Sequence, residues 1–166
     1  MNKQETLDYL KEKGIAFEIT EHGAVYNMAE LAQADLPYPE ADAKNLFVRD
    51  DKKSNYYLIT VRGDKRVDLK EFQKIFGTKR LSFASADDLL SIMGLIPGAV
   101  TPLGLLHDSQ KKVHLYLDKE FEGGLVGVHP NDNTATVWMK TEELVALIKE
   151  HGNAVTIADL SMAVQG

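Results

Sequence analysis

Several sequence features that would indicate a particular function are missing from this sequence of 166 residues. It has no cysteine, which excludes disulfides, thiolate metal ligands and thiol nucleophiles. No apolar run is long enough to span a membrane, and the polar start of the chain lacks the apolar core of a signal peptide. The composition therefore predicts a cytoplasmic protein that is not exported.

Common catalytic motifs are missing as well. There is no phosphate-binding glycine loop followed by lysine and serine, and no dinucleotide-binding glycine triplet, so nucleotide hydrolysis is disfavoured. No serine lies in a Gly-x-Ser-x-Gly elbow. The histidines form no i, i+4 pair, so a catalytic zinc site has little support, and we expect neither a metal nor another cofactor. The histidines are His22, His107, His114, His129 and His151.

Basic residues are outnumbered by acidic ones, which argues against a general binder of DNA or RNA, since the net charge is -6. The charge is nevertheless uneven, because residues 61–80 hold seven basic and three acidic side chains. Such a stretch can steer an anionic partner, although a solvated helix face explains it equally well. The candidate RNA-binding residues are Arg62, Lys65, Arg66, Lys70, Lys74, Lys79 and Arg80.

Length and element order predict one α+β domain over residues 1–166. Because helices are interspersed with hairpins, we expect a mixed β-sheet flanked by helices and not a doubly wound nucleotide fold. Two hairpins are predicted, from 43–50 to 55–61 and from 125–129 to 134–139. The expected helices cover 6–13, 27–34, 69–76, 86–93 and 142–150, the last three capped by Asp68, Ser85 and Thr141. The remaining expected strands cover 15–20, 80–84, 112–117 and 154–157.

Lys44 heads the apolar-rich strand predicted over 43–50, and we interpret it as the centre of the site. Side chains alternate along a strand, so Lys44 shares a face with Leu46 and Val48 while Asn45 faces the other way. Lysine is rarely buried without a partner, so this position predicts a pocket mouth where the ammonium meets an anion or a carbonyl. A strand-end lysine that merely reaches solvent explains the same segment.

Two further polar islands lie in apolar or glycine-rich surroundings, at 98–104 and 127–133. Glycine amides can hold a carbonyl oxygen and a snug cavity can hold a water, so hydrolysis of an activated ester needs no nucleophilic side chain. Taken singly, each island is also explained by ordinary turn chemistry or by the end of a strand.

Together, four segments resemble the YbaK and prolyl-tRNA synthetase editing-domain superfamily, and within it the freestanding alanyl-tRNA(Pro) deacylases known as ProX or PrdX. The resemblance runs from about the first predicted helix to the last, with the same order and similar spacing. The segments are Glu21-His22, Lys44-Asn45-Leu46-Phe47-Val48-Arg49-Asp50, Gly98-Ala99-Val100-Thr101-Pro102-Leu103-Gly104 and Gly127-Val128-His129-Pro130-Asn131-Asp132-Asn133-Thr134-Ala135-Thr136.

The resemblance implies that alanine mischarged onto tRNA(Pro) is hydrolysed from the 3′ end without a metal, and that a hydroxyl of the terminal adenosine assists the attacking water. It implies a catalytic set of Lys44, Gly127 and His129, in which the lysine holds the 3′-terminal phosphate or ester rather than acting as the base. The implied substrate-binding residues are His22, Asn45, Gly98, Thr101, Pro102, Gly104 and Asn131.

Two alternatives stay open, a cysteinyl-tRNA(Pro) deacylase that shares the lysine and a non-catalytic tRNA-binding or regulatory module of the same fold. The expected partner is the aminoacylated 3′ end of tRNA(Pro), with no membrane and no DNA. Whether prolyl-tRNA synthetase is a second partner stays open. The candidate walls of an amino-acid pocket are Met28, Ile96, Val100 and Leu103.

Overall fold

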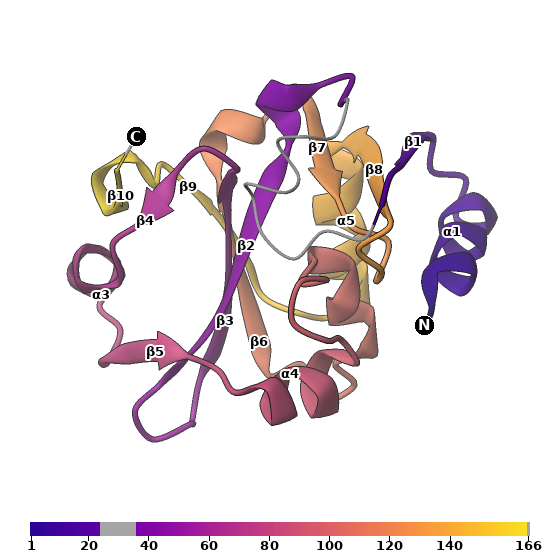
Figure 1. Ribbon diagram of the computed structural model, residues 1–166. Helices are drawn as coiled ribbons and strands as arrows, with labels where there is room; N and C mark the ends of the chain where they lie inside the picture. The colour runs from indigo at the N-terminus through magenta and orange to yellow at the C-terminus, as the bar shows by residue number, and fades with distance from the viewer. Residues whose placement is uncertain (24–35, 166) are drawn as a thin grey trace.

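The larger of two main sheets has five strands and is mixed (Figure 1). The computed structural model describes residues 1–23 and 36–165. β5, β2 and β3 run antiparallel, whereas β3, β6 and β9 run parallel, which confirms the predicted mixed sheet. The strands are, in spatial order, β5 (Leu81–Phe83), β2 (Ala43–Asp50), β3 (Tyr56–Arg62), β6 (Val113–Asp118) and β9 (Val155–Ala158).

The second sheet has three antiparallel strands, in the order β1 (Phe17–Glu21), β8 (Ala135–Lys140) and β7 (Leu125–Val128). Both predicted hairpins are confirmed, because β2 pairs with β3 and β7 pairs with β8. An isolated parallel bridge between Asp42 and Gly127 joins the start of β2 to β7. Two short strands, β4 (Arg66–Val67) and β10 (Val164–Gln165), form a separate pair.

Helix ends follow the local sequence where a cap is present. Asp68 and Ser85 accept backbone N–H groups at the starts of α3 and α4, and Gly77 and Gly94 end these helices in the left-handed conformation. The predicted bounds of both helices are confirmed. The helices with described ends are α1 (Lys3–Glu12), α3 (Leu69–Phe76), α4 (Ala86–Met93) and α5 (Thr141–His151). The 3-10 turns in the described residues cover Pro39–Ala41, Pro102–His107, Lys119–Phe121 and Ser161–Ala163.

Three expectations differ from the structure or lie beyond it. α1 begins three residues before the expected position 6, because Asn2 and Glu5 form a capping box. Thr141 is not a cap, since it is the first residue of α5 and its hydroxyl has no partner among the described residues. The helix expected over 27–34 lies outside the described residues.

The core is divided between the two faces of the five-stranded sheet. One cluster lies between this sheet, the three-stranded sheet and helices α4 and α5, and includes Phe47, Leu58, Val137 and Leu144. The other cluster lies beneath α3 on the opposite face and includes Val48, Ile59, Phe72 and Tyr116. Figure 1 shows α3, β4 and β10 on one side of the sheet and β7, β8 and α5 on the other. Within residues 1–23 and 36–165, no helix has both the length and the apolar character of a membrane-spanning segment.

Candidate active site

Lys44 and Asn45 lie within β2 and therefore face opposite sides of the sheet, as predicted. The Asn45 Oδ1 accepts a hydrogen bond of 2.6 Å from the Thr60 hydroxyl, and its Nδ2 donates to the Val100 carbonyl at 3.4 Å. The Lys44 Nζ donates to the Lys65 carbonyl at 3.4 Å on the other face, so the predicted contact with a carbonyl is present. Both side chains are half-buried. The amide thus faces the 98–104 loop, and the ammonium faces the segment before β4.

The 98–104 loop is held largely by its own packing. Gly98 has a φ of 92°, which favours glycine. Thr101 is fully buried, and its hydroxyl accepts a hydrogen bond from the backbone N–H two residues ahead. Pro102 and Gly104 are also buried, and a Cβ on Gly104 would lie 2.5 Å from Leu95 Cδ1. These residues therefore shape the loop, and the Val100 carbonyl is the loop atom that meets a predicted site residue.

The candidate pocket walls are not equivalent in the structure. Ile96 is 57% exposed, whereas Leu103 is fully buried in the core between the sheets. Val100 is partly buried and packs against that core. Met28 lies outside the described residues. Leu103 therefore supports the loop from below.

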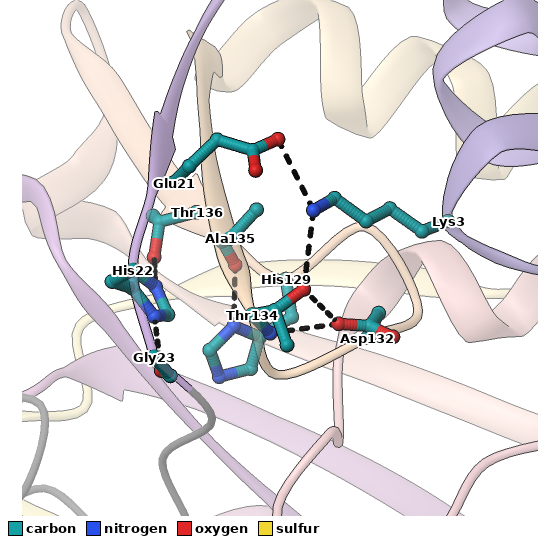
Figure 2. A network of polar contacts seen from close by, with 9 residues as sticks. All are labelled: Lys3, Glu21, His22, Gly23, His129, Asp132, Thr134, Ala135 and Thr136. Carbon is teal, nitrogen blue, oxygen red and sulfur yellow. Dashed lines mark hydrogen bonds and ion pairs between the residues drawn. The ribbon is translucent and has the colours of Figure 1, made fainter.

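A pair of histidines lies where β1 and β7 end, although the two are 107 positions apart in the sequence (Figure 2). The ring centroids of His22 and His129 are 6.2 Å apart, with an edge-to-face angle of 66°. The His22 Nδ1 lies 2.9 Å from the Gly23 carbonyl, and its Nε2 lies 3.0 Å from the Thr136 hydroxyl. Because a carbonyl can only accept, Nδ1 of neutral His22 carries the proton and Nε2 accepts from Thr136.

Among the described residues, one ring nitrogen of His129 has a hydrogen-bond partner and the other has none. Its Nδ1 lies 2.9 Å from the Ala135 carbonyl, so in the neutral ring the proton is on Nδ1 and Nε2 is an acceptor. No described residue hydrogen bonds to this Nε2. Burial lowers the pKa of His129, opposed by the Ala135 hydrogen bond, and nearby His22 lowers it further. His129 is therefore neutral near pH 7 and presents a lone pair.

A polar network ties the turn after His129 to the first helix (Figure 2). The Thr134 hydroxyl donates a short hydrogen bond to Asp132, and its backbone N–H donates to the same carboxylate at 2.8 Å. These contacts lower the pKa of Asp132. The Lys3 ammonium contacts the Thr134 hydroxyl and the Glu21 carboxylate, each at 3.1 Å. The network fixes the turn that orients His129.

Two predicted site residues make contacts that stabilise this turn and sheet. Asn131 has a φ of 61°, and its Nδ2 donates to the Thr6 hydroxyl at 3.0 Å. Gly127 is buried opposite Trp138 in the β7–β8 pair. Both residues therefore have a structural role beside any contact with substrate.

Asp42 belongs to this region but was missed by reasoning from sequence. The residue is 5% exposed, and no residue in the described part of the chain hydrogen bonds to its carboxylate. Burial raises the pKa of Asp42 to about 7. It is paired with Gly127 and stands two positions before Lys44. Its signal in the sequence was weak, because an aspartate just before a strand is usually exposed.

Of the seven predicted RNA-binding residues, four line a common cavity and three lie outside it. Arg62 forms a bidentate contact with Asp64 at 2.7 and 2.8 Å, and Lys65 contributes its carbonyl to Lys44. Lys79 is exposed. The other four, Arg66, Lys70, Lys74 and Arg80, line one cavity of about 840 Å³.

A metal site is not apparent in the described part of the chain, where no three metal-ligating side chains gather at one point. The chemistry that the residues themselves offer consists of a neutral imidazole lone pair, a fixed amide, an ammonium and glycine-rich backbone. Such a set suits a reaction in which a water is positioned beside a carbonyl.

Fold and site together define a class of protein. Residues 22–147 match the family described as the aminoacyl-tRNA editing domain, and the chain therefore belongs to this family. Among its relatives, the prolyl-tRNA editing protein ProX of Acetoanaerobium sticklandii is 38% identical over 159 residues, covering 95% of this chain and 97% of that protein. The prolyl-tRNA synthetase associated domain-containing protein 1 of Xenopus laevis is 35% identical over 156 residues, covering 91% of this chain and 92% of that protein.

Solved structures share the fold. A crystal structure described as a candidate trans-editing enzyme for prolyl-tRNA synthetase superposes with a TM-score of 0.71 at 23% identity, covering 96% of each chain. The hypothetical protein APE2540 superposes with a TM-score of 0.70 at 22% identity, covering 99% of this chain and 100% of that one. The predicted editing-domain fold is confirmed.

Proposed function

We propose that this chain is a trans-editing deacylase that hydrolyses alanyl-tRNA(Pro) to alanine and free tRNA(Pro). The observation that carries the proposal is membership of the editing-domain family together with 38% identity to a prolyl-tRNA editing protein across nearly the whole chain. Alanine is favoured over cysteine because Lys44-Asn45-Leu46-Phe47 resembles the alanine-specific members of the family.

In the proposed reaction, a water attacks the ester carbonyl, the bond from carbonyl carbon to ribose oxygen breaks, and the ribose hydroxyl regains a proton. The Nε2 of neutral His129 accepts a hydrogen bond from the attacking water or from a hydroxyl of the terminal adenosine. Backbone amides of the 98–104 loop hold the carbonyl oxygen as negative charge develops. No side chain forms a covalent intermediate.

Lys44 has the proposed role of holding the 3′-terminal phosphate or the ester. Its ammonium is half-buried, and the contact with the Lys65 carbonyl is long at 3.4 Å. A contact of that length is readily exchanged for a charge-assisted hydrogen bond to a phosphate, which is stronger. The role explains why a lysine stands in a row of core-facing side chains.

Selectivity follows from size. A pocket can exclude amino acids larger than alanine by steric clash, but one missing methyl group is worth only about 1–3 kcal/mol. We therefore expect weak activity on serine and glycine esters. Cognate proline must be excluded by shape, because its hydrolysis would be futile.

The test is a deacylation assay with a chelator present, on alanyl-tRNA(Pro), prolyl-tRNA(Pro), alanyl-tRNA(Ala) and cysteinyl-tRNA(Pro). Wild type is compared with Lys44→Ala and with Lys52→Ala, an exposed lysine in the turn after β2. Rapid loss of alanine from tRNA(Pro), abolished by Lys44→Ala and retained by Lys52→Ala, is the expected result. Preference for the cysteinyl ester would favour the alternative of a cysteinyl-tRNA(Pro) deacylase. No turnover of any ester would favour a binding module.

A further inference from the structure

A groove on the face opposite the histidine pair carries a concentration of positive charge. Its volume is about 840 Å³. Exposed cations come from β4, from α3 and from the residue before β5, while Asp68, Gln73 and three apolar side chains supply the rest of the lining. The lining residues are Arg66, Val67, Asp68, Leu69, Lys70, Gln73, Lys74, Arg80 and Leu81.

The cations of the groove are poorly neutralised. Asp68 is the one acidic residue in the lining, and its carboxylate is engaged as the cap of α3, accepting from the Lys70 and Glu71 backbone N–H groups. Lys74 makes an exposed contact of 3.4 Å with Glu71, which is worth little in water. In the part of the chain that the structure describes, Arg66, Lys70 and Arg80 form no ion pair. The groove is therefore an attractive region for anions on a protein whose net charge is -6.

The groove lies next to Lys44. The Lys44 ammonium contacts the carbonyl of Lys65, and the following residue, Arg66, lines the groove. Leu46 and Val48 share the face of Lys44 and pack in the cluster beneath α3, which forms one side of the groove. A chain of phosphates that passes through the groove would therefore reach Lys44 at the start of β2, the end of the strand that the bridge between Asp42 and Gly127 joins to β7 and so to His129.

We propose that this groove binds the sugar-phosphate backbone of the tRNA acceptor arm, in the segment that leads to the 3′ end at Lys44. The identity of the RNA rests on the proposed function. A volume of 840 Å³ with four cations around it fits several successive phosphates better than one free phosphate ion. The groove would recognise the charge of the backbone and not the base sequence, because lysine and arginine contacts to phosphates position a nucleic acid without specifying its bases.

The test is binding of uncharged tRNA(Pro), measured by fluorescence anisotropy over a series of KCl concentrations. The groove variant is Lys70→Glu with Arg80→Glu, which reverses charge on α3 and before β5. The matched control is Lys11→Glu with Lys140→Glu, two exposed lysines on α1 and β8 that change the net charge by the same amount. Circular dichroism establishes that both variants fold.

We expect the groove variant to bind about tenfold or more weakly at low salt, and its slope of log K against log salt to fall by roughly 1.4 to 1.8, since each phosphate contact contributes about 0.7 to 0.9. The control should keep the wild-type slope. Equal slopes in the two variants would overturn the proposal. The proposal would also be overturned if poly-glutamate, at the same concentration of negative charge, displaced tRNA as well as RNA does. That result would favour an acidic protein as the partner.

The binding assay uses uncharged tRNA, so its outcome does not depend on hydrolysis. If wild type deacylates alanyl-tRNA(Pro) while the groove variant binds normally, the groove proposal fails and the proposed function stands. If wild type binds RNA through the groove without hydrolysing any ester, the proposed function fails and the groove proposal stands.

Discussion

The indole ring of Trp138 occupies the space that a side chain at position 127 would need. A Cβ on Gly127 would lie 2.3 Å from ring atom Cζ3 and 2.6 Å from Cε3. The ring is fixed, because its Nε1 donates to the Thr20 hydroxyl at 2.9 Å and Tyr38 packs edge-on with a centroid separation of 5.5 Å. Packing alone therefore requires glycine at 127, whatever its amide does in catalysis.

Gly127→Ala should lower the free energy of unfolding by about 1–3 kcal/mol, because an overpacked core must shift to admit the methyl group. Urea denaturation measures the change. Gly124→Ala is the control on the same segment, since its Cβ would meet no atom closer than 3.9 Å. Equal stability of the two variants would contradict the packing requirement.

Asp42→Asn should stabilise the protein at neutral and alkaline pH. In the unfolded chain this carboxyl ionises near pH 4, but burial raises the pKa of Asp42 to about 7 in the folded protein. The unfolded state therefore releases its proton first, and the stability contribution of Asp42 is lost as pH rises from about 4 to 7. The variant should gain up to about 4 kcal/mol at pH 8 and little at pH 4.

Denaturation curves at several pH values measure this difference. Asp51→Asn, in the exposed turn after β2, is the control and should show no such gain. A difference between Asp42→Asn and wild type that does not change with pH would mean that the carboxyl is not held protonated.

His129→Asn should reduce kcat for alanyl-tRNA(Pro) by about 10²-fold or more, because asparagine is too short to place an acceptor where Nε2 lies. In wild type the rate should fall on acidification, since the pKa of His129 lies below its ordinary value and protonation removes the acceptor. His114→Asn is the control, because burial lowers the pKa of His114 as well but its Nε2 is bonded to Thr156. If the rate of His129→Asn fell on acidification as it does in wild type, His129 would not be the acceptor in the reaction.

Thr60→Val should loosen the 98–104 loop. The Thr60 hydroxyl is buried and donates to Asn45, whose amide reaches the Val100 carbonyl. Removing the donor leaves a carbonyl oxygen of Asn45 unpaired and should cost about 1–3 kcal/mol. Hydrogen exchange of the loop should then quicken. Thr156→Val, which removes the partner of His114 on β9, should leave exchange of the loop at the wild-type rate.

Local features of the fold could be predicted from the sequence because local residues determine them. Asp68 and Gly77 bound α3, and the turn at 51–55 dictates that β2 pairs with β3. Pairing between distant strands could not be predicted, since many strands have similar patterns and nothing local selects the partner. The parallel β3–β6–β9 order and the β1–β8 pair are of this kind.

The candidate site likewise has features that local sequence predicts and features that depend on pairing between distant strands. Alternation along one strand correctly separated Lys44 from Asn45. His22 and His129 could each be singled out, but their contact depends on the β1–β8 pair. The burial of Asp42 depends on the bridge to β7, which no local pattern indicates.

The pairing of β1 with β8 also bears on how the protein is made. Phe17 lies opposite Met139, so the ribosome must release about 140 residues before the three-stranded sheet can close. Until then the first strand has no partner and the two histidines remain apart. Contacts of such long sequence separation form late and slowly. A nascent chain would thus emerge without its imidazole pair, and the competence to act on an ester would arrive only after β8 has left the ribosome.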